Sequence, residues 1–338
     1  MRPGICYNKN IMAEIQYSFA PMEGITYARY RMLHRGMFGG AEKYYTPFIA
    51  PDSRGCFKHA FLRELTEDQY AGLVPQLLVN NSGAFNATAL KLHELGFPEI
   101  NLNTGCPSGT VFSKHKGAGM LADPETLRQT LEGIYEQAER TGYRVSIKTR
   151  MGVESTGEFP AILEVFRQFP VSELIVHARC REDFYEGRAD LEAFAKAAAD
   201  CALPMTYNGD IRTAYDVEQV LTRVPACTRV MIGRGAVTNP AVFRELRGGP
   251  ELNRGELRAF HDELVRIWLE VGLSPGFTMM RMKTLWAYLK ELFPDAKKSV
   301  KAVLKAKNLS EYQSAARILL EGDGSLDLPG SKESGIGG

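Results

Sequence analysis

The chain has 338 residues, 44% of them hydrophobic and 24% charged, and a formal net charge of +1. This composition is typical of a globular protein that buries a sizeable core, and it argues against a disordered or fibrous chain. The first 16 residues are polar, no run reaches the roughly 20 apolar residues that cross a bilayer, and the six cysteines include no Cys-x-x-Cys pair. We therefore expect a cytoplasmic protein with reduced thiols, no membrane segment and no metal site.

Short apolar runs of strand length recur eight times in the first 232 residues, and helical patterns lie between most of them. This alternation predicts parallel strands joined by right-handed crossovers, and eight such units close a barrel of about 250 residues. The rival is an open doubly wound sheet, but no strand is followed by its Gly-x-Gly-x-x-Gly fingerprint. The strands are expected at 17–22, 43–48, 74–79, 99–103, 144–149, 173–177, 204–208 and 229–232, and the helices at 84–95, 124–140, 159–169, 191–200, 214–223 and 241–246.

The Arg-Gly-Gly-Pro segment at 247–250 reads as a linker, and only helical patterns follow it, at 255–271, 278–292, 295–306 and 310–320. The prediction is a (β/α)8 TIM barrel at 17–247 and an all-α domain at 251–321, flanked by an N-terminal extension at 1–16 and a disordered Gly/Ser-rich tail at 322–338. Residues 279–308 contain eight Lys or Arg and two acidic residues, an excess of six. Nucleic-acid binding needs such a local basic surface more than a high net charge.

Polar or reactive residues stand at the carboxyl end of nearly every expected strand. In a closed parallel barrel these positions converge on one rim, where the active sites of this fold lie. The residues are Glu23, Gln76, Asn103, Lys148, His177, Asn208 and Arg234.

Cys106 lies between Gly105 and Pro107, immediately after the fourth expected strand. A tight turn there would project the thiol over the barrel mouth, and with an ordinary pKa of about 8.5 the thiol keeps a proton to donate at neutral pH. The alternative is that Cys106 fills a small apolar space, as buried cysteines usually do. Position alone leaves both interpretations open.

Two further clusters have the composition of a flavin site. An isoalloxazine ring needs donors at its pyrimidine edge, a nearby cation and an apolar shelf, which Gln76, Lys148 and Met22 can supply. The Asn-Gly-Asp segment at 208–210 and the Gly-Arg-Gly segment at 233–235 follow the last two strands, where barrels bind phosphate. Each of these residues, taken alone, could have a purely structural role. An Asn-Gly pair, for example, is usually only a turn.

Three other residues are weaker candidates. His177 could hydrogen-bond a flavin and Arg179 could reach substrate, although a lone rim histidine is more often structural. Lys114, in the loop after Cys106, is a surface charge by default and an RNA contact if the loop folds over the mouth.

Seven motifs jointly resemble the dihydrouridine synthase family, flavoenzymes that reduce uridines of tRNA. They are Ala-Pro-Met-Glu-Gly at 20–24, Gln-Leu at 76–77, Leu-Asn-Thr-Gly-Cys-Pro-Ser at 102–108, Ile-Lys-Thr-Arg at 147–150, Val-His-Ala-Arg at 176–179, Asn-Gly-Asp at 208–210 and Ile-Gly-Arg-Gly at 232–235. The resemblance implies that NADPH reduces FMN, that the flavin N5 delivers hydride to C6 of uracil, and that Cys106 protonates C5.

The resemblance also implies two sets of binding residues. Asn103 and Arg150, with Arg179 and Lys114, would contact the flipped uridine or its RNA, while the basic helical segment docks on the tRNA backbone. The flavin would be held by Pro21, Met22, Glu23, Gln76, Lys148, His177, Asn208, Gly209, Asp210, Gly233 and Arg234.

Three alternatives stay open at this point: a dihydroorotate dehydrogenase-like FMN barrel acting on a small molecule, a related enzyme acting on ribosomal RNA, and a non-catalytic flavin-bearing RNA binder. The first leaves the basic helical segment without a role. A monomer is expected, and the modified uridine is not predicted.

Overall fold

The computed structural model describes residues 12, 14–52, 56, 59–68, 70–199, 201–322 and 326–328. Most of the expected N-terminal extension at 1–16 and of the expected tail at 322–338 lies outside these residues.

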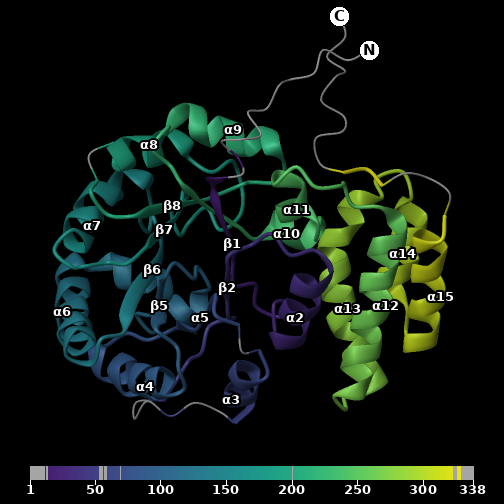
Figure 1. The fold of residues 1–338 in the computed structure, drawn as a ribbon, viewed down its shortest axis with the longest axis horizontal. Coiled ribbons are helices and arrows are strands. Elements are labelled where there is room, and N and C mark those ends of the chain that lie inside the picture. Colours follow the sequence, from purple (N-terminus) through teal and green to yellow (C-terminus); the bar gives the residue numbers. More distant parts are fainter. Residues whose placement is uncertain are drawn as a thin grey trace, which may run out of the picture.

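The described chain forms one nine-stranded parallel sheet that curves into a barrel, with helices around its outside (Figure 1). The sheet begins with β3 (Leu73–Val74) and ends with β4 (Gln76–Leu77), which are two halves of one strand on either side of Pro75. Pro75 interrupts the strand because it has no backbone N–H to donate. The segment after β2 closes the barrel onto β4, because the Ile49 N–H donates to the Gln76 carbonyl at 2.8 Å and the Ile49 carbonyl accepts from Leu78 N–H at 2.9 Å. The predicted (β/α)8 barrel is confirmed.

Each expected apolar run overlaps an observed strand, because these residues are buried on the two faces of a parallel sheet. β5 (Glu99–Thr104) is buried along its whole length. The remaining strands are β1 (Gln16–Phe19), β2 (Lys43–Tyr45), β6 (Arg144–Arg150), β7 (Leu174–His177), β8 (Met205–Asn208) and β9 (Arg229–Ile232).

Six barrel helices lie where they were predicted: α4 (Ser82–Glu94), α6 (Pro124–Thr141), α7 (Phe159–Phe166), α8 (Leu191–Ala199), α9 (Ala214–Arg223) and α11 (Val242–Leu246). The sequence did not predict α2 (Ala28–Met37), α3 (His59–Thr66), α5 (Gly109–Phe112), α10 (Arg234–Thr238) or the 3₁₀ turns η1 (Gly117–Ala122) and η2 (Thr156–Glu158).

Helix α2 escaped prediction because its buried face carries polar residues. Arg31 is 1% exposed and donates to Asp68 at 2.9 Å and to Glu64 at 2.8 Å. His34 is fully buried, with Nδ1 3.0 Å from the Tyr44 hydroxyl. Such residues erase the apolar periodicity by which an amphipathic helix is recognised.

The helices after the linker form a bundle against one side of the barrel, on the right in Figure 1. In its core the Tyr312 hydroxyl accepts from Trp286 Nε1 at 2.8 Å and lies 2.6 Å from His261 Nε2. Phe260 packs its ring 5.5 Å from Tyr30 on α2 of the barrel and 5.3 Å from Phe38, which directly follows α2. The bundle comprises α12 (Arg254–Glu270), α13 (Pro275–Leu289), η3 (Lys290–Leu292), α14 (Lys297–Lys305) and α15 (Leu309–Leu320), which confirms the predicted all-α region.

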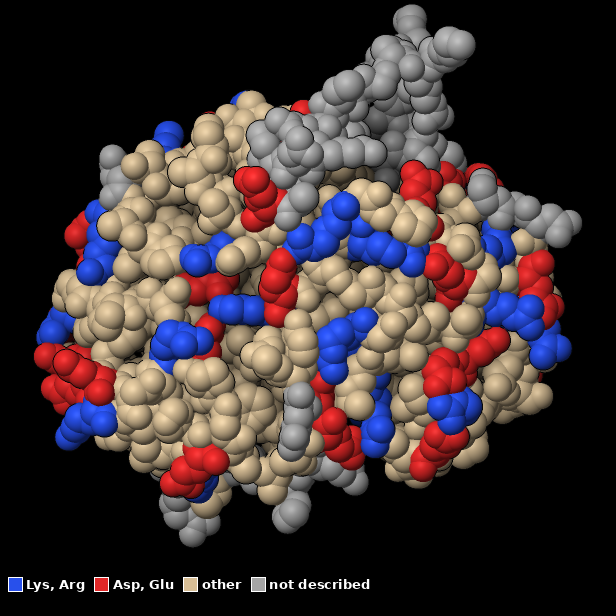
Figure 2. Space-filling model, in the orientation of Figure 1, with Lys and Arg blue, Asp and Glu red and all other residues tan. Residues whose placement is uncertain are grey.

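The surface charge is mixed on the face seen in Figure 2, where Lys and Arg alternate with Asp and Glu over both the barrel and the helical side. The basic segment is locally organised on α14: Val300 and Val303 are buried, while Lys297, Lys301 and Lys305 are exposed at four-residue intervals. None of the helices in the described part of the chain is long and apolar enough to span a membrane.

Candidate active site

A cavity of about 430 Å³ opens at the carboxyl ends of the barrel strands. Thirteen of the predicted site residues line it, although they come from every part of the barrel sequence. They are Pro21, Met22, Glu23, Gln76, Asn103, Cys106, Lys148, Arg150, His177, Asn208, Gly209, Gly233 and Arg234.

Three predicted residues do not line the cavity. Arg179 is 1% exposed and lies behind the wall, paired with Asp210 at 2.7 Å. Lys114 lies exposed on the surface after α5, and its carbonyl accepts from Asn80 Nδ2 at 3.0 Å. Arg179 and Asp210 therefore support the site from outside it, and Lys114 is not part of its lining.

The Cys106 turn is shaped by Asn103, the last side chain but one of β5. Asn103 Oδ1 accepts the N–H groups of Gly105 at 3.0 Å and Cys106 at 2.9 Å, while its Nδ2 donates to Gln76 Oε1 at 2.8 Å. Gly117 passes behind the turn with φ of +55°, where a Cβ would lie 2.9 Å from the Cys106 Cβ. A side chain at 117 would push the cysteine out of place.

The thiol of Cys106 keeps its proton in this setting. Burial raises the pKa of Cys106, and the nearby cations Arg150 and Lys148 oppose that rise only in part. A protonated thiol on the cavity wall is a proton donor of the kind that general-acid catalysis requires.

Lys148 lies on the cavity wall without a carboxylate partner. Burial, together with the positive charge of Arg150, lowers the pKa of Lys148 to about 7. No carboxylate in the described part of the chain acts on Lys148, so it forms no ion pair with Glu23. Glu23 instead accepts from the Tyr27 hydroxyl at 3.1 Å, and burial raises its pKa. The cavity therefore holds an amine that titrates near neutral pH, and an anionic ligand would favour its charged form.

His177 is a neutral imidazole in this environment. Burial and the positive charges of Lys148 and Arg150 hold the pKa of His177 well below 6.5. Its Nε2 lies 3.1 Å from Arg179 Nη1, a group that can only donate, so Nε2 accepts and the other ring nitrogen carries the proton. His177 can thus donate one hydrogen bond through Nδ1.

Arg150 joins two loops of the cavity. It donates to the carbonyls of Gly105 at 3.0 Å, Cys180 at 2.6 Å and Phe184 at 2.5 Å. The first belongs to the cysteine turn and the other two to the loop after β7. Because Arg150 is 1% exposed and each of its three nitrogens donates to a loop carbonyl, its role in this geometry is to position both loops.

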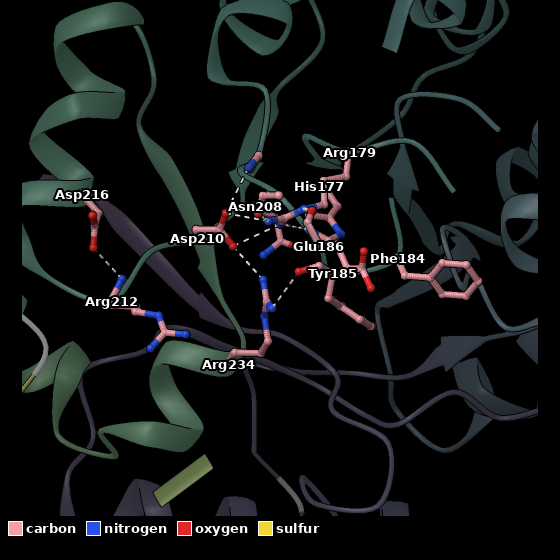
Figure 3. Close-up of polar contacts among 12 residues, drawn as sticks. His177, Arg179, Phe184, Tyr185, Glu186, Asn208, Asp210, Arg212, Asp216 and Arg234 are labelled. Carbon is pink, nitrogen blue, oxygen red and sulfur yellow. Dashed lines mark hydrogen bonds and ion pairs between the residues drawn. The ribbon is translucent and has the colours of Figure 1, made fainter. Parts of the chain in front are cut away.

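The wall after β8 and β9 is a network of charges centred on Asp210 (Figure 3). Asp210 accepts from Arg179 at 2.7 Å, from Arg234 at 2.6 Å and from the Ala189 N–H at 3.0 Å. The two loops can approach only because Gly235 lacks a side chain, since a Cβ there would lie 2.2 Å from the Ile211 carbonyl. Arg234 is thereby held at the cavity wall by rigid partners.

Seven lining residues were not predicted as site residues. Ala20, Gly105 and Pro107 lie within the sequence motifs, whereas Pro47, Phe48, Tyr185 and Tyr288 lie outside them. Tyr185, in the loop after β7, lies under the guanidinium groups of Arg150 at 5.4 Å and Arg234 at 5.0 Å. Tyr288 comes from α13 of the helical bundle. A tyrosine in a segment rich in Arg is the only sequence signal for Tyr185, and no local signal marks Tyr288.

The five described cysteines, Cys56, Cys106, Cys180, Cys201 and Cys227, are free. Within the described residues no group of His, Cys, Asp and Glu side chains is placed to hold a metal ion.

A parallel barrel with a polar cavity at its carboxyl rim defines the class as a (β/α)8 protein with the architecture of barrel enzymes. The chain belongs to the dihydrouridine synthase family, because residues 18–317 match the family model described as Dihydrouridine synthase (Dus). A similar protein is the tRNA-dihydrouridine(16) synthase of Shigella flexneri, 30% identical over 69% of this chain and 71% of the relative. Another, of the same name, from Aquipseudomonas alcaligenes, is 28% identical over 83% of this chain and 92% of the relative.

Among solved structures, a 2-naphthoyl-CoA reductase complex aligns with a TM-score of 0.50 and 10% identity, covering 70% of this chain and 50% of that one. At this identity the likeness concerns the fold alone.

Proposed function

We propose that the protein reduces uridine to 5,6-dihydrouridine in tRNA, with FMN as cofactor and NADPH as the reductant of FMN. The observation that carries the proposal is the meeting of the Cys106 thiol, the unpaired Lys148 ammonium and the Arg234 wall on one cavity. Family membership and relatives named tRNA-dihydrouridine(16) synthase support the same reaction.

The lining residues fit FMN. Lys148 offers a cation for the anionic ring, Gln76 keeps one free amide N–H beyond the one it donates to Asn101, and Met22 provides an apolar surface beside Gly233. Gly209, Gly233 and Arg234 suit the phosphate group. A cavity of about 430 Å³ lies in the range of small-molecule sites. When bound and reduced, FMN supplies the hydride for C6 of the uracil.

The chain's own residues supply the proton and the orientation. Cys106 holds a proton over the cavity and delivers it to C5, since burial keeps the thiol protonated. Asn103 and Arg150, expected to contact the uridine, act here through the Cys106 turn to which they are hydrogen-bonded. His177 donates through Nδ1 to the ligand.

The substrate must be extruded from its RNA stack to enter this cavity. We assign the barrel at 17–247 to the chemistry and the helical domain at 251–321 to RNA docking, with the exposed lysines of α14 meeting phosphates.

The test is anaerobic oxidation of the reduced, FMN-loaded protein by bulk tRNA lacking dihydrouridine, with ribosomal RNA, free uridine and orotate in parallel. Rapid flavin oxidation by tRNA alone, with dihydrouridine detected in the product, is expected. Oxidation by orotate or uridine at the tRNA rate would establish a small-molecule reductase instead, oxidation by ribosomal RNA would reassign the substrate, and RNA binding without oxidation would leave a flavin-bearing RNA binder.

A further inference from the structure

The loop after β7 presents two aromatic side chains at the cavity mouth, Phe184 at 43% and Tyr185 at 55% exposure. Tyr185 lines the cavity, whereas Phe184 does not. In Figure 3 the Phe184 ring points away from the cluster formed by His177, Asp210 and Arg234. Phe184 therefore lies next to the cavity without contributing to its wall.

The backbone at Phe184 is held in a rare conformation. Among the described residues other than glycine, only Phe184 and His115 have positive φ, and that of Phe184 is +47°. Such a conformation is rare in a bulky residue and persists only when neighbours impose it. Arg150 imposes it by donating to the Phe184 carbonyl at 2.5 Å, while the Phe184 N–H donates to Arg181 O at 3.1 Å. The Phe184 side chain remains exposed, so its burial does little to offset this backbone strain.

Phe184 belongs to a small platform of stacked groups. The Arg181 guanidinium lies 5.4 Å from the Phe184 ring centroid and 4.4 Å from that of Phe112, on α5 just after the Cys106 turn. We call Phe112, Arg181 and Phe184 the mouth platform. It bridges the two loops that Arg150 also connects, so its place relative to Cys106 is set by the same side chain that shapes the cavity.

Flat π faces joined by a guanidinium plane are the surface on which proteins stack unpaired nucleobases. Extruding one base from RNA also unstacks its neighbour, which then needs a new partner. Phe184 of the platform directly precedes Tyr185, which lines the cavity. The platform therefore lies where the neighbouring nucleotide would leave the cavity. The Arg181 cation, although also paired with Glu182 at 2.5 Å, suits RNA better than an apolar protein partner.

We propose that the mouth platform binds, by stacking, the nucleobase adjacent to the uridine held in the cavity. This rests on the proposed function and extends it to a second nucleotide of the same RNA. Phe184 then contributes to the choice of sequence around the target as well as to affinity.

The first test replaces the ring while respecting the backbone. Phe184→Asn removes the aromatic group with a residue that tolerates positive φ, so the melting temperature should stay or rise. Dihydrouridine formation in tRNA should fall roughly 5- to 150-fold in kcat/KM, the range expected for one base–aromatic stack. Phe184→Tyr should retain activity. Tyr215→Ala on α9, where the tyrosine is 41% exposed away from the cavity lining, is the matched control and should leave turnover unchanged.

The second test is a double cycle with the RNA. Once the modified uridine is mapped, tRNA transcripts carry an abasic nucleotide on its 5′ or 3′ side. One of the two abasic transcripts should lower the kcat/KM of the wild type about as much as Phe184→Asn lowers it on intact tRNA. The kcat/KM of the Phe184→Asn variant should fall no further on that transcript.

The platform proposal would be overturned if Phe184→Asn turned over tRNA as fast as the wild type. It would also be overturned if the variant remained slower than the wild type by the same factor on both abasic transcripts. In either case the activity of the wild type would still support the proposed function. Failure of the wild type to form dihydrouridine in any tRNA would overturn both.

Discussion

The floor and the rim of the cavity are built by different means. On the floor, polar side chains stand at the ends of adjacent strands, and the ladder pairs Asn103 with Lys148 and His177 with Asn208. On the rim, Tyr185 is placed by a loop and Tyr288 by a helix of the bundle. Backbone pairing therefore determines the floor, whereas the rim depends on side chains such as Arg150 that bond to loop carbonyls. Changes to the floor should alter chemistry or stability, and changes at the rim or bundle should alter RNA binding.

The largest effect is expected next to the floor, from Cys106→Ala in the turn that directly follows β5. Loss of the general acid should lower kcat about 10²- to 10⁴-fold, because C5 of the uracil loses its proton donor. The affinity for tRNA should stay close to that of the wild type. Single-turnover kinetics with reduced enzyme measure the first quantity, and filter binding measures the second. Cys201→Ala, at a cysteine outside the cavity, is the control and should be fully active.

Asp210→Ala tests whether the wall after β8 depends on its charge network. The change leaves Arg179, which is 1% exposed, without its carboxylate, and removing one partner of such a pair destabilises by about 3 kcal/mol. Urea unfolding measures the change. Glu192→Ala breaks the ion pair with Arg223, whose side chains are 66% and 49% exposed, and should change stability by less than about 1 kcal/mol. Equal losses in both variants would contradict the role of the network.

Lys148→Met tests the unpaired cation through pH. The pKa of Lys148 is lowered to about 7 in the folded, ligand-free protein, against 10.5 for an ordinary lysine. Between these values the unfolded chain binds one more proton than the folded chain, so this residue makes stability rise with pH; below pH 7 the burial penalty is present in full.

Lys148→Met lacks that penalty. It should therefore be more stable than the wild type at pH 6, and the difference should shrink by pH 9 when urea midpoints are compared. Lys196→Met, at an exposed position of α8, should show a constant difference. A pH-independent gap for Lys148→Met would count against the unpaired ammonium.

The smallest effect is expected far from the floor, on α14. Lys297→Glu combined with Lys301→Glu should weaken tRNA binding severalfold and reduce the slope of log K against log salt by about two, without loss of FMN. Binding titrations at several salt concentrations measure this slope. Arg140→Glu with Lys196→Glu, exposed cations on α6 and α8 of the barrel, are the matched control. An unaltered slope in the α14 variant would exclude this helix from the RNA contact.

Much of the floor could be predicted from the sequence. Parallel strands buried on both faces must be apolar, so the eight runs stood out, and their polar last residues were predicted to meet once the barrel closed. Lys148, His177 and Asn208 were placed in this way, and all three line the cavity. The position of Cys106 followed because its motif directly succeeds a strand.

The tertiary structure alone decided which groups these residues meet. Arg150 and Arg179 resemble substrate-binding arginines in the sequence, yet their donors are engaged by loop carbonyls and by Asp210. Tyr288 reaches the mouth only because α13 packs against the barrel. The strand ends meet because parallel strands pair side by side in the barrel, and the apolar runs that mark those strands can be read from the sequence. Loop paths and docked helices depend on many weak long-range contacts, which leave no local pattern to read.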